Sequence, residues 1–160
     1  MTVWKLWFDG GCENNGGPKA SATYGYVLLN TETKKRYTGR GPVLSSRPTN
    51  NLAEWAALLA GVRRLVKKAD PGDTAELIGD SLLVVNGVTG KWKGKDQRLA
   101  RMKSLVKTEL DKLGNWSAIW VPREQNQEAD EVGRKKSKKT VDLRFLDAPV
   151  PAPVTRRGFF

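Results

Sequence analysis

The chain has 160 residues, with 28 Lys and Arg against 17 Asp and Glu, which gives a formal net charge of +11 at pH 7. This length predicts a single domain with a proper core, and the positive charge predicts a polyanionic partner such as nucleic acid. The absence of histidine excludes Ser-His-Asp and Cys-His catalysis and histidine-ligated zinc. If the protein is an enzyme, carboxylates that bind a hard metal ion are the natural remaining chemistry.

The cysteine and apolar content bear on where the protein resides. Cys12 is the one cysteine, which excludes an intrachain disulfide and favours a reducing, cytoplasmic setting. Polar residues interrupt the only early apolar run, which argues against a signal peptide. No stretch has the roughly 18 apolar residues of a membrane span, so we expect no membrane partner.

The first predicted element is a strand, Val3–Asp9, which is closed by Gly10 and Gly11. Apolar side chains lie on both of its faces, which is typical of a central strand that is covered on both sides. Asp9 is then a carboxylate at the end of a buried strand, which is costly unless something compensates its charge. A metal ion would do so; the alternative is that Asp9 begins an Asx-turn into the two glycines.

Hydrophobic periodicity predicts the remaining elements. Further strands are expected at Thr23–Leu29, Lys35–Gly41, Ala75–Gly79 and Trp116–Val121, and helices at Asn51 to about Lys68, Ser81–Val88, Asp96–Leu113 and Gln125 to about Lys136. Connections through helices make the first, fourth and fifth strands parallel, while the second and third form an antiparallel annex. The third strand is polar and is expected at an edge of the sheet. The pattern predicts an α/β fold.

Acidic residues recur at the ends of neighbouring strands. Asp9 ends the first strand and Asp80 follows the fourth, so both are expected at the same edge of the sheet, where sites of α/β proteins lie. Glu54 in the first turn of a helix and Asp130 in the last helix can approach that edge. Such carboxylates repel one another unless divalent cations neutralise them, and oxygen ligands suit Mg²⁺ or Mn²⁺. A pair of such ions supports phosphodiester hydrolysis.

Each acid also has a purely structural interpretation. Glu54 can be the capping-box partner of an N-cap at Asn51, and Asp80 can be the N-cap of the helix that follows it. Asp130 can be one of several acids on a helix surface. Taken together, these interpretations leave unexplained why acids follow two neighbouring strands.

Four motifs in register resemble type 1 ribonuclease H over residues 2–136: Asp9-Gly10-Gly11, Thr49-Asn50-Asn51-Leu52-Ala53-Glu54, Gly79-Asp80-Ser81 and Asn126-Gln127-Glu128-Ala129-Asp130. The resemblance implies a catalytic domain over residues 1–136 with a ribonuclease H-like fold, whose five-stranded mixed sheet has the order 3-2-1-4-5 and is flanked by helices. It implies metal-dependent cleavage of the RNA strand of RNA/DNA hybrids, leaving 5′-phosphate and 3′-OH ends. It also implies that two Mg²⁺ or Mn²⁺ ions are held by Asp9, Glu54, Asp80 and Asp130.

Two other functions remain open on the same fold. One is a non-catalytic module that binds RNA/DNA hybrids, and the other is a different nuclease of the ribonuclease H-like superfamily, such as a DNA-cutting resolvase. The full set of four acids argues against the first function, since a phosphate binder has no use for clustered negative charge. A panel of labelled substrates separates all three.

The resemblance also implies substrate contacts. Residues in matching motifs and loops are expected at the substrate: Gly10, Gly11, Asn15, Thr49, Asn50, Asn51, Arg123 and Asn126. The family commonly carries a histidine before the last helix, with a role in proton transfer or product release. Either Arg123 or Glu124 takes over this role here, or metal-bound water suffices. The long basic insertion of some members is missing, and Lys91, Trp92 and Lys93 lie in a compact basic-aromatic stretch that can grip the DNA strand. The alternative for Trp92 is that it packs on the core.

Residues 137–160 form a basic, Pro-containing segment. Its composition predicts a disordered tail rather than a second domain, and its lysines predict non-specific contacts with nucleic acid. Docking of Phe159 and Phe160 on the domain is the alternative. We expect a monomer.

Overall fold

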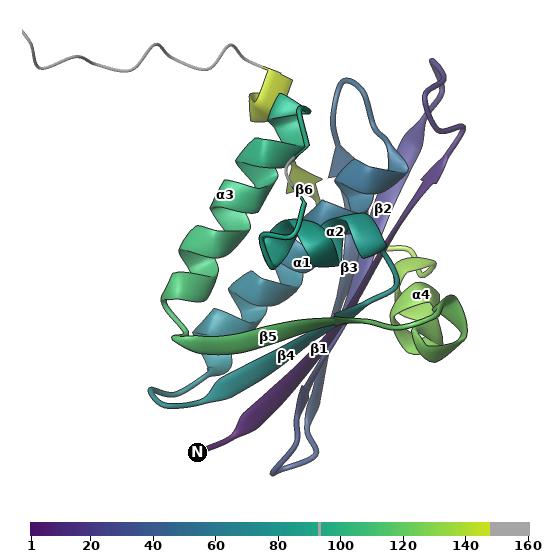
Figure 1. Cartoon of the computed structure of the whole chain (residues 1–160). Coiled ribbons are helices and arrows are strands. Elements are labelled where there is room, and N and C mark those ends of the chain that lie inside the picture. Colours follow the sequence, from purple (N-terminus) through teal and green to yellow (C-terminus); the bar gives the residue numbers. More distant parts are fainter. Residues whose placement is uncertain (93, 148–160) are drawn as a thin grey trace, which may run out of the picture.

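The computed structural model describes residues 1–92 and 94–147. The strands are β1 (Val3–Glu13), β2 (Ser21–Asn30), β3 (Arg36–Leu44), β4 (Thr74–Gly79), β5 (Asn115–Trp120) and β6 (Val141–Asp142). The helices are α1 (Asn50–Lys68), α2 (Leu82–Val88), α3 (Gln97–Asp111) and α4 (Gln127–Gly133), with 3-10 turns at Arg123–Gln125 and Arg144–Asp147. Helices α1 and α3 cover one face of the sheet, and α4 packs on the other face against β1, β2 and β3 (Figure 1).

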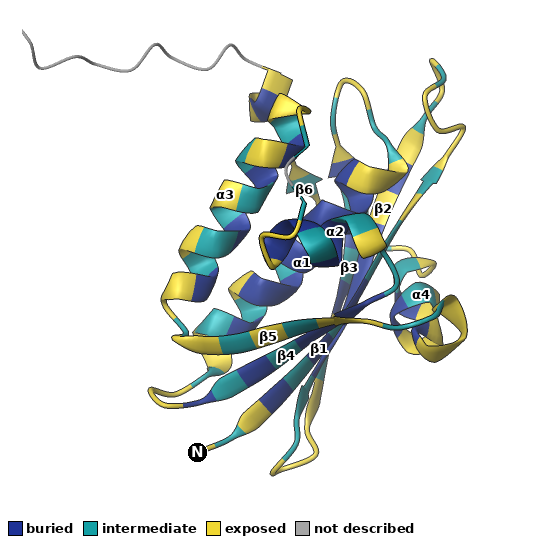
Figure 2. Cartoon of the chain, viewed as in Figure 1, coloured by how far each residue is buried: buried dark blue, intermediate teal, exposed yellow. Residues whose placement is uncertain are grey.

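Strand β1 lies in the middle of the sheet, whose order is β5-β4-β1-β2-β3-β6. It pairs antiparallel with β2 and parallel with β4, and β4 pairs parallel with β5, which confirms the predicted mixed topology. Trp4, Leu6 and Phe8 of β1 are buried, as expected for a central strand. Figure 2 shows that buried positions run along the middle of the sheet. The carboxyl ends of β1 and β4 therefore meet at one edge.

Helix α1 supplies most of the cover over the sheet. Large apolar side chains such as Trp55, Leu58 and Leu65 are fully buried, because they recur at the spacing that keeps them on one face. The N-cap is Thr49, two residues earlier than predicted, because the Thr49 hydroxyl accepts a hydrogen bond from the Leu52 N–H at 3.1 Å. The predicted N-cap at Asn51 is therefore wrong.

The sheet has six strands among the described residues, not the five predicted. The extra strand β6 pairs parallel with β3 only at Val43 and Leu44, so the segment predicted as an edge, Lys35–Gly41, has no strand on its outer side among the described residues. Beyond β6, Leu143 and Leu146 are buried, with 1% and 5% exposure. The described part of the segment predicted as a tail thus packs on the core, because its few apolar side chains fill the margin of the sheet. The predicted roles of Phe159 and Phe160 lie outside the described residues.

The last predicted helix is shorter in the structure. A 3-10 turn at Arg123–Gln125 precedes α4, which ends at Gly133 rather than near Lys136. Helix α4 lies close to β2, since a Cβ atom at Gly25 would come within 2.5 Å of the Gly133 nitrogen. In the described ranges, 1–92 and 94–147, no helix combines the length and apolarity needed to cross a bilayer.

Candidate active site

Three carboxylates converge where β1 and β4 end. Asp9 comes from β1, Glu54 from the first turns of α1, and Asp80 from the residue after β4. One carboxylate oxygen of each lies within 4.8 Å of the others. The parallel register explains this, because Phe8 pairs with Gly79 and so the next residue of each strand emerges at the same edge. The predicted juxtaposition of these three acids is thus what the fold produces.

The close approach of β1 to α1 depends on Gly10. A Cβ atom at this position would come within 2.2 Å of the Ala53 backbone, so only glycine lets the strand pass under the first turn of the helix. The Gly10 N–H then donates a hydrogen bond to the Glu54 carboxylate at 3.1 Å. Gly10, which was predicted to contact substrate, thus has a positioning role here.

The structural interpretations of the three acids do not hold. Strand β1 continues past Asp9 to Glu13 in register with β2, so no Asx-turn begins at Asp9. Ser81, not Asp80, caps α2, because its hydroxyl accepts from the Val84 N–H. Glu54 accepts from Gly10 and not from the N-cap of its own helix, so it forms no capping box.

The environment of the cluster disfavours negative charge. Burial, and then the charges of Asp9 and Asp80, raise the pKa of Glu54 to about 9. Burial, the charge of Asp80 and a hydrogen bond with Asp130 raise the pKa of Asp9 to about 7, while Arg123 acts in the opposite direction. None of the ion pairs formed among the described residues involves Asp9, Glu54 or Asp80. A divalent cation would relieve this repulsion, and an all-oxygen donor set suits Mg²⁺ or Mn²⁺.

Asp130 approaches the cluster from α4, on the other face of the sheet. It lines a cavity of about 460 Å³ together with Asp9 and Arg123. The Asp130 carboxylate forms an ion pair with Arg134 at 2.9 Å. Asp130 is not part of the group formed by Asp9, Glu54 and Asp80, whose oxygens lie within 4.8 Å of one another. Arg134 was not among the predicted site residues, although the spacing of four residues along a helix is typical of such a pair. Glu124 is exposed and does not line this cavity.

Asn126 is buried, with 1% exposure, and its predicted contact with substrate stays a prediction. Its side-chain amide donates to the Phe8 carbonyl at 2.9 Å and to the Asp80 carboxylate at 3.2 Å. These two bonds tie the loop before α4 to the ends of β1 and β4. Asn126 is therefore a positioning residue that fixes the orientation of Asp80.

The polar residues predicted to bind phosphate gather at the start of α1. The Asn15 side chain accepts a hydrogen bond from the Asn50 N–H at 3.0 Å, which joins the loop after β1 to the helix. A cavity of about 320 Å³ is lined by Asn15, Thr49, Asn50 and Asn51, and on its other side by Asp96 and Leu99 of the α3 start. Gly11 lines the neighbouring cavity with Asp9. A helix N-terminus with amide side chains suits a phosphate group.

Trp92 packs against the core rather than standing free. It is half-buried, and Cβ atoms added at Gly87 and Gly94 would lie 3.7 Å and 1.8 Å from its ring, so both backbones run along the indole. This favours the alternative in which Trp92 anchors a turn. Lys91 is exposed beside it, and Lys93 lies outside the described residues.

A mixed sheet of this order, with acids at the carboxyl end of its central strand and helices on both faces, defines the ribonuclease H-like class of α/β proteins. The family model described as reverse transcriptase-like matches residues 7–136. The chain is 38% identical over 125 residues to ribonuclease HI of Halobacterium salinarum, covering 78% of this chain and 59% of that protein. The chain therefore belongs to the type 1 ribonuclease H family.

Solved structures agree with this assignment. The N-terminal RNase H domain of Rv2228c from Mycobacterium tuberculosis superposes with a TM-score of 0.74 at 28% identity, covering 83% of this chain and 91% of that one. LC11-RNase H1, solved in complex with RNA/DNA hybrid, gives a TM-score of 0.69 at 25% identity, covering 81% and 92%. The chain spans 59% of the Halobacterium protein and 32% of full-length Rv2228c.

Proposed function

We propose that the protein is a metal-dependent endoribonuclease that hydrolyses the RNA strand of RNA/DNA hybrids and leaves 5′-phosphate and 3′-OH ends. The observation that carries this proposal is the group of three carboxylates within 4.8 Å of one another at the end of β1, in a chain of the ribonuclease H family. Neighbouring acids with raised pKa values are typical of a catalytic site. The hybrid complex of LC11-RNase H1 supports the substrate class.

Asp9, Glu54 and Asp80 are the residues that would hold two Mg²⁺ or Mn²⁺ ions, joined by Asp130. Such ions, when bound, supply Lewis acidity at the phosphate and favour deprotonation of an attacking water. The chain's own contribution is to fix the carboxylates before substrate arrives. Gly10 anchors the Glu54 carboxylate and Asn126 anchors that of Asp80.

Asp130 and its neighbours form the other wall of the proposed site. The ion pair with Arg134 holds Asp130 toward the cavity that it shares with Asp9 and Arg123. Arg123 brings a positive charge to the cavity, which suits contact with a substrate phosphate or the release of a phosphorylated product. Arg123 is better placed than Glu124 for the role that a loop histidine has in relatives, since Glu124 lies off the cavity.

Polar groups at the start of α1 are proposed to hold the substrate backbone beside the acids. The Asn15, Thr49, Asn50 and Asn51 set combines amide side chains with the positive end of a helix dipole, which favours a phosphate. Amide side chains also hydrogen-bond to 2′-hydroxyl groups and base edges. We further propose that residues 1–136 are the catalytic domain and that Lys91 contacts the DNA strand. The protein is also proposed to act as a monomer in the cytoplasm.

A panel of end-labelled substrates tests the function directly. RNA/DNA hybrid, duplex DNA, duplex RNA and single strands are incubated with Mg²⁺, with Mn²⁺ and with EDTA. We expect cleavage of the hybrid alone, only in the RNA strand and only with metal. Equal cutting of all substrates, or cutting of duplex DNA, would favour another nuclease of the superfamily, and tight hybrid binding without cleavage in any metal would favour the binding module.

A further inference from the structure

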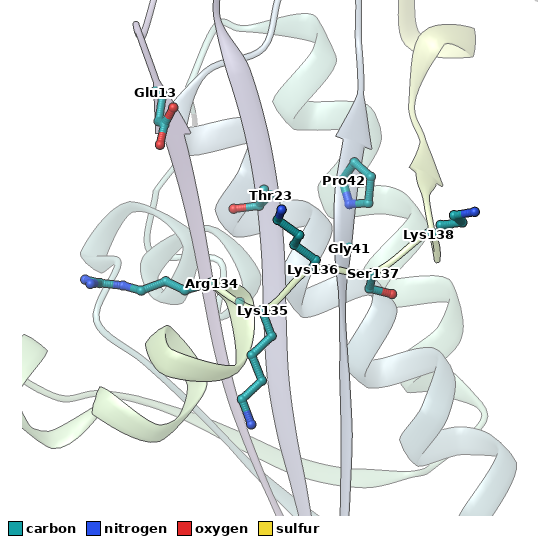
Figure 3. Close-up of a pocket in the computed structure, with 10 residues that line it drawn as sticks. Glu13, Thr23, Gly41, Pro42, Arg134, Lys135, Lys136, Ser137 and Lys138 are labelled. Carbon is teal, nitrogen blue, oxygen red and sulfur yellow. The ribbon is translucent and has the colours of Figure 1, made fainter.

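A basic cavity lies beside the acidic cluster and has no part in the chemistry proposed above. It has a volume of about 770 Å³ and lies between the connection from α4 to β6 and the face formed by β1, β2 and β3 (Figure 3). Arg134, Lys135, Lys136 and Lys138 line one side, with Glu13 and Thr23 opposite. The side chains of the four basic residues project from the connection in different directions in Figure 3.

The basic charges are available to a ligand. Five of the six residues from 134 to 139 are Lys or Arg. Lys135, Lys136 and Lys138 are exposed, and none of them appears in the ion pairs formed within residues 1–92 and 94–147. Glu13 is the single acid lining the cavity. The net charge of the walls therefore favours an anion.

The connection that carries these lysines is fixed at both ends. At its start, the Arg134 and Lys135 N–H groups donate to carbonyls of α4. At its far end, the Tyr24 hydroxyl donates to the Lys139 carbonyl at 2.8 Å, and the Lys139 N–H donates to the Ser137 hydroxyl at 3.1 Å. Gly41 allows this contact, since a Cβ atom there would come within 1.9 Å of the Lys139 oxygen. A fixed backbone lowers the entropy cost of binding.

The basic cavity continues the acidic one. Glu13, Thr23, Gly133 and Arg134 line both, so a chain of phosphates that passes Asp9 and Asp130 reaches the lysines without leaving the surface. The volume is that of a site for a ligand of modest size, which suits a short stretch of one strand. Positive charge along a groove is the usual way to hold the backbone of a single strand.

We propose that this cavity is a subsite for the sugar-phosphate backbone of a single-stranded extension of the substrate, held by Lys135, Lys136 and Lys138 as it leaves the acidic cluster. The inference rests on the proposed function, because it concerns the same nucleic-acid substrate. It predicts that a hybrid carrying an unpaired extension on one strand end binds more tightly than a blunt hybrid. It also predicts that the gain depends on these three lysines.

The test compares equilibrium binding in EDTA, where no cleavage is needed for the readout. The probes are a blunt hybrid and four hybrids extended by about eight nucleotides at the 5′ or 3′ end of either strand, a length within reach of one binding groove. The variant is Lys135→Gln/Lys136→Gln/Lys138→Gln, which keeps Arg134 because that residue pairs with Asp130. The control, Lys34→Gln/Lys67→Gln/Lys107→Gln, removes the same charge away from both cavities.

We expect at least one extension to tighten binding by the unmodified protein about 10-fold. For that extended hybrid, the slope of log binding constant against log salt concentration should fall in magnitude by about 2 in the triple-lysine variant, as for the loss of three single-strand phosphate contacts. The control should keep the gain. The proposal is overturned if no extension helps, or if the cavity variant retains the gain. Cleavage of blunt hybrid is measured separately with Mg²⁺ and distinguishes failure of the subsite proposal from failure of the nuclease proposal. If the hybrid is cleaved but no extension tightens binding, only the subsite proposal is overturned. If an extension tightens binding through the lysines but no hybrid is cleaved, only the nuclease proposal is overturned.

Discussion

Two carboxylates with little solvent-exposed area lie at opposite ends of the parallel strands β1 and β4, and their surroundings differ sharply. Glu54, at the carboxyl end, has 9% exposure, and Asp73, at the amino end, has 5%. Asp73 accepts hydrogen bonds at 2.9 Å from the Thr2 N–H, the Trp4 indole and the Asp70 N–H. Glu54 accepts one from the protein, from Gly10, and faces two other acids.

The pKa values of the two groups move in opposite directions as a result. Burial raises the pKa of Asp73, but the hydrogen bonds from Trp4, Thr2 and Asp70 outweigh it, so the pKa of Asp73 is lowered overall. The pKa of Glu54 is raised to about 9 by burial and by Asp9 and Asp80. One end of the sheet therefore uses a buried acid to stabilise the fold. At the other end, the acids repel one another and lower the stability of the fold, which is the pattern expected where acids serve a function.

The strongest test of this contrast is Asp9→Asn. We expect hybrid cleavage to fall about 10³-fold or more, because a metal ligand in the proposed site is lost. The metal-free protein should gain about 1 kcal/mol of stability, since one repelling charge is removed. Cleavage rates with Mg²⁺ and urea unfolding in EDTA measure the two effects. Asp70→Asn, at an exposed acid, serves as the control and should change neither; an active Asp9→Asn would remove Asp9 from the site.

The opposite substitution is Asp73→Ala. We expect a loss of about 2–3 kcal/mol in the free energy of unfolding, because the Trp4 indole and two backbone N–H groups lose their charged acceptor. Activity per folded molecule should stay within about twofold of the unmodified enzyme, since the site lies at the other end of the strands. Urea titration and cleavage at low temperature report the two quantities. Wild-type stability in this variant would contradict the contrast between the two ends.

A smaller effect is expected at Asn126. Asn126→Ala removes the hydrogen bond that orients Asp80, and losses of this kind typically cost about 10–100-fold in metal affinity or rate. The loss should be in kcat or in the metal concentration needed for half-maximal rate, with hybrid KM little changed, because the buried Asn126 side chain bonds to the Phe8 carbonyl and the Asp80 carboxylate. Titration with Mg²⁺ at saturating hybrid separates these terms. A change confined to KM would instead indicate that Asn126 contacts the substrate.

The predicted fold and the acidic site came from features that are local in the sequence. Periodic apolar residues define the strands and helices, and an acid directly after each of two parallel strands must emerge at one edge. Helix starts were harder to place, because Thr49, Asn50 and Asn51 are all good caps and only the Asn15 contact and the packing of α1 select among them.

Features that depend on long-range contacts could not be predicted. Asn126 reads as a helix-start residue, and its bonds to the Phe8 carbonyl and Asp80 join segments far apart in the chain. Strand β6 has only two residues, in a lysine-rich segment whose composition resembles disorder. Its pairing with β3, and the burial of Leu143, arise only once the margin of the sheet exists. Trp92 was equally ambiguous, since a stacking tryptophan and a core tryptophan look alike in sequence.

The pH dependence of stability compares the two ends of the sheet in a single experiment. The pKa values of Asp9 and Glu54 are raised from 3.8 and 4.5 to about 7 and about 9, so the folded state binds their protons more tightly than the unfolded state. The free energy of unfolding of metal-free protein should therefore fall between pH 5 and pH 8, by on the order of 1–2 kcal/mol. The contribution of Asp73 to stability changes with pH in the opposite direction, because its lowered pKa stabilises the fold above pH 3.8 and this stabilisation is lost on acidification. Urea titrations in EDTA measure the fall, and saturating Mg²⁺ should abolish it by binding the ionised carboxylates. The slope should be shallower in Asp9→Asn, whereas stability that rises from pH 5 to pH 8 without metal would mean that these acids are not held in a repelling cluster.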